Sequence, residues 1–173
     1  ACENVSNIAA KALEDSRIGI SPLEKSTRYV YFDKKVNNRY LYHLEQNIMA
    51  SRHADLYVQT CDSLFGSYAK WIEPLKKYLT EKFPKGEESE RAYNSSIKAK
   101  ACDILRGYLP AATLTNVGLF GNGRAFEYLL TRMYSGELVE LRGLAGDMHE
   151  ELMKVIPSFV KLAKGKYPIE SVA

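Results

Sequence analysis

Residues 103–130, "DILRGYLPAATLTNVGLFGNGRAFEYLL", contain three successive elements and the turns between them. A helical apolar pattern ends ahead of Pro110, because proline cannot continue a helix. Residues 111–120 are β-branched and apolar, which indicates a strand or an extended segment. The turn at 121–124 leads into a new helical pattern over 123–134. We therefore expect a helix, an extended segment and a second helix in this order.

The rest of the chain is mostly helical in pattern. Apolar residues at helical spacing predict helices over residues 3–15, 51–83, 92–105 and 137–155, and a short helix that begins at Pro157. Pro74 should kink or break the helix over 51–83. Residues 84–90 are expected to form an exposed linker, and the tail from Lys164 is expected to be loose.

Two short aromatic segments predict a β-hairpin. "RYVYF" (28–32) and "YLYHL" (40–44) are rich in aromatic and β-branched residues, as strands are. Asn37 and Asn38 lie in the polar turn between them and tolerate left-handed geometry. The sequence therefore predicts an α+β fold, a helix-dominated domain with a small antiparallel sheet, over residues 1–173.

Length and charge restrict the function classes. The 173 residues suit one domain, and a net charge of +3 is too small to indicate nucleic-acid binding. No apolar run approaches the ~20 residues needed to cross a membrane, so no membrane partner is expected. The chain opens inside a helical pattern without an initiator Met, which raises the expectation that it is part of a longer protein.

The cysteines and histidines indicate neither a disulfide framework nor a metal site. Cys2, Cys61 and Cys102 are odd in number and widely spaced. Cys61 and Cys102 occupy apolar positions of helical patterns, so we expect buried thiols, a reducing compartment and a cytoplasmic location. No histidine lies in a zinc motif, so no metal is predicted.

The first candidate site is in "GISPLEKSTRYVYF" (19–32), at Glu24, Ser26 and Arg28. In an extended segment these three side chains alternate onto one face. That face offers a guanidinium fork for phosphate, a hydroxyl donor, and an acceptor for a ribose or base N–H. The alternative is a solvated entrance to a strand with a Glu–Arg pair, and composition alone favours this alternative.

The second candidate site is in "GLFGNGRAFEYLL" (118–130). Its glycines let the backbone approach something closely, and Asn122 and Arg124 flank the turn into a helix. A helix N-terminus beside an arginine suits an anion. The segment lacks the Gly-Lys-Ser/Thr of a P-loop. The alternative is a tight turn followed by a helix cap.

The spacing in "SRIGISPLEKSTRY" (16–29) resembles the signature of the flavin-dependent thymidylate synthases. That signature reads Arg-His-Arg, two residues, Ser, four residues, Ser, one residue, Arg. Ser21, Ser26 and Arg28 stand at the two serines and the final arginine. Glu24 stands where the family commonly has an acidic residue.

A second motif is similar to the same family. Family members have a helix ending in Leu-Pro, a short β segment, and Asn-Ala-Arg opening a helix. In this chain Leu109-Pro110 is followed by the 111–120 segment and by Asn122-Gly123-Arg124. The resemblance covers roughly residues 5–32 and 97–160.

The resemblance implies an activity and a set of ligands. Family members are homotetramers that bind FAD at a subunit interface, reduce it with NADPH, and methylate dUMP to dTMP with methylenetetrahydrofolate. The implied residues are Glu24, Ser26, Arg28 and Arg124 for dUMP, Arg17, Ser21, Asn122 and Arg124 for FAD, and Ser26, Arg28 and Arg132 for catalysis.

The chain departs from the family pattern at several places. Ser16-Arg17-Ile18 replaces the Arg-His-Arg triplet, which removes two cations and a histidine. By strict spacing the family's later arginine falls on Met133, with Arg132 beside it, and one residue on a helix is about 100° of rotation. Family members also carry a strand and a helix before the signature, for which this chain begins too late.

These departures keep two other hypotheses open. In one, the domain has lost flavin chemistry and serves as a nucleotide-binding or assembly module. In the other, it is a helical protein-interaction domain whose exposed tyrosines form the contact.

Overall fold

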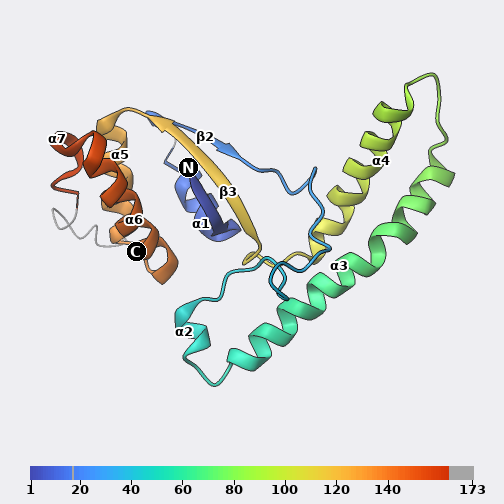
Figure 1. Ribbon diagram of the computed structural model, residues 1–173, viewed down its shortest axis with the longest axis horizontal. Helices are drawn as coiled ribbons and strands as arrows, with labels where there is room; N and C mark the ends of the chain where they lie inside the picture. Colours follow the sequence, from blue (N-terminus) through green and yellow to red (C-terminus); the bar gives the residue numbers. More distant parts are fainter. Residues whose placement is uncertain (17, 164–173) are drawn as a thin grey trace.

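The strand β3 (Leu114–Gly121) is the centre of a three-stranded sheet. The structure is a computed structural model that describes residues 1–16 and 18–163. β3 pairs antiparallel with β1 (Cys2–Ser6) along one edge and with β2 (Ile20–Glu24) along the other (Figure 1). The predicted extended segment before the GNGR turn is therefore confirmed as a strand.

The predicted helix over 3–15 is wrong in its first part, which forms β1. The expectation that the chain begins too late for a strand and a helix ahead of residues 16–28 is also wrong, because β1 and α1 lie there. The helix α1 begins only at Asn7 and ends at Glu14. Ser6 caps it, because its side chain accepts a hydrogen bond from the Ala9 backbone N–H. Asn4 adopts a left-handed φ of 56°, at an irregularity in the β1–β3 pairing. Pairing with β3 has overridden the local helical pattern.

The predicted hairpin of 28–32 with 40–44 is also wrong. The strand lies earlier, in β2, where Pro22 is tolerated because β2 is an edge strand. Phe32 and Tyr31 instead pack in a cluster with helix residues, whereas Tyr29 is 65% exposed. The predicted turn is confirmed: Asn37 and Asn38 have φ values of 49° and 63°.

The helices after residue 50 lie close to where the sequence predicts them. Their bounds are α2 (Gln46–Met49), α3 (Ala54–Lys82), α4 (Glu90–Leu105), the 3-10 turn η1 (Arg106–Tyr108), α5 (Gly123–Tyr134), α6 (Val139–Val155) and α7 (Pro157–Val160). The predicted break at Pro74 is wrong, because α3 continues through it. Pro74 and Lys70 are both exposed, so water can reach the carbonyl of Lys70 that the proline leaves without an N–H partner. None of the described helices is both long and apolar enough to span a membrane.

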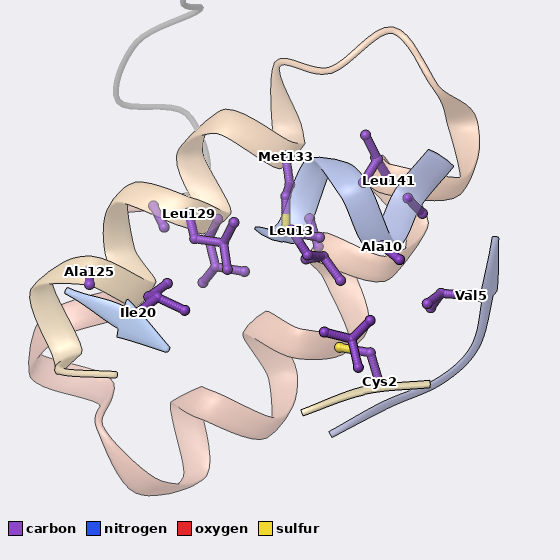
Figure 2. Close-up of a cluster of buried hydrophobic side chains, with 14 of the residues drawn as sticks. Cys2, Val5, Ala10, Leu13, Ile20, Ala125, Leu129, Met133 and Leu141 are labelled. Atoms are coloured by element: carbon purple, nitrogen blue, oxygen red, sulfur yellow. The ribbon is translucent and has the colours of Figure 1, made fainter. Parts of the chain in front are cut away.

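The buried apolar residues form separate clusters on two sides of the sheet. The larger cluster joins β1, β3 and the start of β2 to α1, α5, α6 and α7 (Figure 2). A second cluster joins residues 30–44 to α3 and the end of α4, and a third lies between α3 and α4. In Figure 1 the α3–α4 hairpin extends away from the sheet, on the side opposite α5, α6 and α7.

A polar cluster joins these parts. Glu140, in the first turn of α6, accepts hydrogen bonds from the backbone N–H (2.7 Å) and the hydroxyl (2.6 Å) of Ser6. The ring of His43 lies 3.7 Å from Glu140 and 3.3 Å from Glu45. Tyr57 of α3 donates to the His43 carbonyl at 2.7 Å. The cluster fixes the N-cap of α1 against α6 and against the segment that leads into the helical hairpin.

Replacing Leu129 by alanine tests the larger core. Leu129 is 1% exposed, and its side chain points from α5 into the core (Figure 2). Leu129→Ala should therefore reduce the free energy of unfolding by about 2–5 kcal/mol. The matched control is Leu56→Ala, because Leu56 is 63% exposed on α3, and its cost should be within about 0.5 kcal/mol. Urea unfolding followed by circular dichroism measures both. Equal effects of the two substitutions would contradict this packing.

Candidate functional site

The two candidate sites of the sequence lie at opposite ends of the β2–β3 ladder. Ile20 pairs with Gly121, and the backbone N–H of Lys25 donates to the carbonyl of Asn116 at 3.0 Å. Five residues of β3 separate these points, which is roughly 17 Å at strand spacing. Because the strands are antiparallel, Arg28 and Arg124 leave the ladder at different ends. The structure therefore does not bring the two arginines together within one chain.

The chain turns directly after β2, which changes the first site. The strand ends at Glu24, and Thr27 and Arg28 lie in a turn in which the Ser26 hydroxyl accepts from the Arg28 backbone N–H at 3.3 Å. The prediction that residues 24, 26 and 28 alternate onto one extended face is therefore wrong. The turn directs Arg28 toward α4, where its Nε lies 3.2 Å from Asp103 Oδ1.

A second arginine, absent from the sequence predictions, shares that carboxylate. Arg106 Nε also lies 3.2 Å from Asp103 Oδ1. Both guanidinium groups approach the same carboxylate oxygen, and the Arg28 and Arg106 side chains are 51% and 43% exposed, so an anion can reach them from solvent. Beside them is a hollow of about 440 Å³, lined by Asn7, Thr27, Asp103, Ile104, Arg106, Gly107 and Leu109. The i, i+3 spacing of Asp103 and Arg106 ahead of Leu-Pro was the available signal.

Glu24 lies beside a second carboxylate. Its carboxyl group is within hydrogen-bonding reach of the Glu14 carboxyl at the end of α1 and of the Thr115 hydroxyl. Burial and the negative charge of Glu14 raise the pKa of Glu24, against the opposing effect of the Thr115 hydrogen bond. Glu24 therefore keeps its proton to a higher pH than an ordinary glutamate does.

Ser21 points to the other face of the sheet from Glu24. Residues three apart in a strand lie on opposite faces. Ile20, on the Glu24 face, is 5% exposed. On the Ser21 face, Leu23 and Phe120 are 78% and 82% exposed. This face of the β2–β3 pair is an open apolar surface.

The second site surrounds the start of α5. Asn122 caps the helix, because its Oδ1 accepts from the Ala125 backbone N–H at 2.9 Å. A hollow of about 410 Å³ lies next to it, lined by Gly19, Ile20, Ser21, Phe120, Gly121 and Asn122. The helix cap that the sequence offered as an alternative is thus present, and Ser21 and Asn122 share one hollow.

The glycines of this turn approach other parts of the protein. A Cβ on Gly121 would lie 2.7 Å from the carbonyl oxygen of Gly19, and one on Gly123 would lie 2.6 Å from the Phe159 ring. The close approach predicted for this turn is therefore to β2 and α7. Arg124 lies over the same Phe159 ring at 5.9 Å and forms a 2.6 Å ion pair with Glu127.

Arg132 and Met133 differ sharply in environment. Met133 is 3% exposed in the larger core. Arg132 is exposed, donates from Nη1 to the Ser16 hydroxyl at 3.2 Å, and lies 5.9 Å from the Tyr128 ring centre. Arg17, predicted near FAD, lies outside the described residues.

The cysteines are buried, as predicted for Cys61 and Cys102, and all three are free thiols. Burial raises the pKa of Cys2, Cys61 and Cys102, so the thiolate form is disfavoured in each. Among the described residues no group of three or more His, Cys, Asp or Glu side chains could hold a metal ion.

Comparison with known proteins identifies related sequences. The family model described as "Thymidylate synthase complementing protein" matches residues 1–158. The chain is 52% identical over 165 residues to a UPF0159 protein of Chlamydia muridarum, covering 95% of this chain and 31% of that protein. A UPF0159 protein of Thermoplasma acidophilum is 33% identical over 180 residues, covering 91% of this chain and 36% of that protein. The chain thus spans about a third of the length of these curated relatives.

A solved structure also aligns with the chain. It is the UMP/dUMP methylase PolB from Streptomyces cacaoi bound with 5-Br UMP, with a TM-score of 0.48 and 17% identity. The alignment covers 91% of this chain and 68% of that one.

The Glu14–Glu24 pair gives a testable pH dependence. Because the pKa of Glu24 is raised in the folded state, this carboxyl contributes most stability below its ordinary value of 4.5. The contribution is lost as the pH rises through the raised value. Glu14→Gln removes the neighbouring charge but not the burial, so the pKa of Glu24 should fall toward its ordinary value.

Carbon-detected NMR titration of the Glu24 carboxyl measures this shift. Glu3→Gln, at an exposed residue of β1, is the control and should leave the titration of Glu24 unchanged. An unchanged Glu24 pKa in the Glu14→Gln protein would show that the two carboxyl groups do not interact.

Proposed function

The chain belongs to the thymidylate synthase complementing protein family, the flavin-dependent thymidylate synthases, and from this premise we propose that it methylates dUMP to dTMP. Methylenetetrahydrofolate would supply the carbon, and NADPH would reduce a bound FAD. The observation that carries the proposal is the pair of guanidinium groups of Arg28 and Arg106 around Asp103, with Ser26 and Glu24 in the stretch of chain just before Arg28.

The Arg28 end of the ladder suits a nucleoside monophosphate. Two guanidinium groups share one carboxylate, so this cluster has a net positive charge. Arginine forks match phosphate oxygens with two parallel hydrogen bonds. Ser26 supplies a hydroxyl, and the Glu24 carboxyl group supplies oxygens that can accept from a uracil or ribose donor. We assign dUMP to this end.

The start of α5 suits the anionic part of FAD. The donors there are the Ser21 hydroxyl and the Asn122 amide N–H groups, which line a hollow of about 410 Å³. This volume is in the range of ligand pockets, and the donors fit a phosphate group. Arg124 would contribute after exchanging Glu127 for the ligand. FAD, when bound, would supply the reducing equivalents for the transferred carbon.

A site with both halves requires a second copy of the chain. Arg28 and Arg124 are separated along the ladder in one chain, so they can meet only across a subunit interface. The exposed face with Leu23 and Phe120 offers apolar contact for such an interface. We therefore propose a homo-oligomer, a tetramer by analogy with the family, in which Arg28 of one copy faces Arg124 of another.

Two observations favour a second candidate function, nucleotide binding without flavin turnover. Ser16 replaces a triplet cation of the family signature and is 6% exposed, and Met133 is buried where the later arginine falls. In that case the protein binds dUMP but releases no tritium from dUMP labelled at uracil C5, whereas methylation at that carbon releases it.

Arg28→Ala tests the proposed dUMP site. Truncating one arginine of a phosphate clamp removes charged hydrogen bonds worth about 1.5–3 kcal/mol, which is ~10- to 150-fold in affinity. Isothermal titration calorimetry with dUMP measures the loss. Arg91→Ala, at an exposed position in the first turn of α4, is the matched control and should bind dUMP like the unmodified protein. Equal affinities for both variants would remove dUMP from this end.

Mixing two inactive variants tests the shared site. Arg28→Ala and Arg124→Ala should each abolish tritium release from labelled dUMP when alone. A pair of one Arg28→Ala subunit and one Arg124→Ala subunit forms two shared sites, and one of these sites keeps both arginines. Random pairing of the two variants therefore restores about a quarter of all sites. Native mass spectrometry confirms that mixed oligomers have formed. Mixed oligomers with no recovered activity would show that both arginines act in the same subunit.

A further inference from the structure

We propose that Arg132 binds a phosphate group on the exposed face of α5, and that Ser16 is the positioning residue that holds the Arg132 side chain in place. The ligand class is a phosphate or phosphate ester, with the Tyr128 ring available to a planar group attached to it. The identity of the ligand as FAD rests on the proposed function, but the phosphate site itself does not.

Ser16 and Arg132 are held together from two different elements. Ser16 follows α1 and is 6% exposed, whereas Arg132 is in the last turn of α5. Arg132 Nη1 donates to Ser16 Oγ at 3.2 Å. A buried hydroxyl requires a hydrogen-bond partner, and this one is supplied from across the domain. The contact restrains a long side chain that would otherwise sample many rotamers in solvent.

Arg132 differs from the other arginines of the two sites in its charge balance. Arg28 and Arg106 share Asp103, and Arg124 pairs with Glu127. Over residues 1–16 and 18–163, no carboxylate forms an ion pair with Arg132, whose contacts are the Ser16 hydroxyl and the Tyr128 ring. An anion can therefore bind Arg132 without breaking an ion pair to a described residue. Within residues 1–16 and 18–163 the guanidinium donates one hydrogen bond, to Ser16, of the five that it can make.

The spacing along α5 adds a recognition surface. Tyr128 and Arg132 are four residues apart, so they lie on one face, and Arg124 is four residues earlier on the same face. Tyr128 is 57% exposed and lies under the Arg132 guanidinium at 5.9 Å. The stripe is about 12 Å long at helical rise. A nucleotide fits it with a phosphate at Arg132 and its ring on Tyr128, since aromatic rings stack on exposed tyrosines.

Binding of three probes tests the proposal: inorganic pyrophosphate, ADP and FAD, each measured by calorimetry on the unmodified protein and on variants. Arg132→Gln should weaken pyrophosphate and ADP by about 10- to 150-fold. Ser16→Ala keeps the charge and should weaken them by about 5-fold, the effect of one net hydrogen bond. Arg91→Gln, at the exposed position on α4, controls for the general loss of one positive charge.

The double variant separates positioning from a merely structural effect. If Ser16 acts through Arg132, Ser16→Ala adds no further loss in the Arg132→Gln background. Additive losses, or unchanged pyrophosphate binding by Arg132→Gln, would overturn the proposal. Absence of pyrophosphate and ADP binding by the unmodified protein would also overturn it. Because Arg132 is exposed, its variant remains a test even if Ser16→Ala does not fold.

The probes also distinguish this site from the flavin function. Pyrophosphate and ADP that bind through Arg132, with no binding of FAD, would support the phosphate site and remove the flavin from the proposed function. Equal losses of ADP and pyrophosphate affinity in a Tyr128→Ala variant would exclude the Tyr128 ring contact, because pyrophosphate has no ring. A Tyr128→Ala variant that loses affinity for ADP but not for pyrophosphate would support that contact.

Discussion

The antiparallel pairing of β2 with β3 fixes the position of every candidate ligand contact. Five residue pairs, from Ile20–Gly121 to Glu24–Val117, form this ladder. Its direction sends the chain after β2 toward α4 and the chain after β3 into α5. A parallel pairing would have placed both exits at one edge, as in nucleotide-binding α/β folds. Here the geometry divides the anion-binding residues into two groups, each too small to surround a large ligand alone.

The separation has an electrostatic consequence. A chain with a net charge of only +3 still presents two distinct cationic regions. Arg28 and Arg106 lie at one end of the ladder, and Arg124 and Arg132 lie on the helix that follows the other end. At the Arg28 end the cations are restrained by a carboxylate that they share, and at the α5 end Arg132 is restrained by a hydroxyl and an aromatic ring. Shared or neutral partners hold a guanidinium in place while leaving it attractive to an anion. One-to-one ion pairs, such as Arg124 with Glu127, hold the side chain but reduce that attraction.

The sequence predicts the helical part of this fold much better than the sheet. Residues 54–82 and 123–155 form helices because their apolar spacing is long and regular, and Asn122 and Pro157 mark helix starts. β1 and β2 are edge strands with Asn, Ser and Pro, whose local preferences are not those of strands. They form because β3 presents an unpaired backbone on each side, which is a property of the tertiary structure. The aromatic segment 28–32 has strand propensity, but its Phe32 ring is buried in the cluster with α3 instead.

For the candidate sites, too, the sequence predicts local features but not the contacts between distant segments. Spacing alone points to Ser26, Arg28, Asn122 and Arg124 as polar residues at turns. It does not reveal that Asp103 and Arg106 join Arg28, because this contact forms only when α4 packs back against the turn after β2. It also does not reveal that the glycines of the GNGR turn accommodate Gly19 and Phe159. Both the arginine cluster at Asp103 and the neighbours of these glycines depend on contacts between segments far apart in sequence. The residue type at a single position carries little information about such contacts.

Met133 stands where strict spacing puts the family's later arginine, and the packing of α5 is consistent with an apolar residue at this position. Ala125, Leu129 and Met133 form the buried stripe of the helix, and Arg124, Tyr128 and Arg132 form the exposed stripe one residue earlier. A guanidinium at position 133 would have to leave this stripe or be buried without a partner, which is costly. At position 132 the cation has nearly the same height on the helix but lies about 100° away.

From that direction the Arg132 side chain reaches the start of the α1–β2 connection, where a small residue is needed at position 16 to accept it. An arginine at position 16 would repel the incoming guanidinium at this distance. Ser16 and Arg132 are therefore physically coupled, and together they return one positive charge to the region from which the altered triplet removes it.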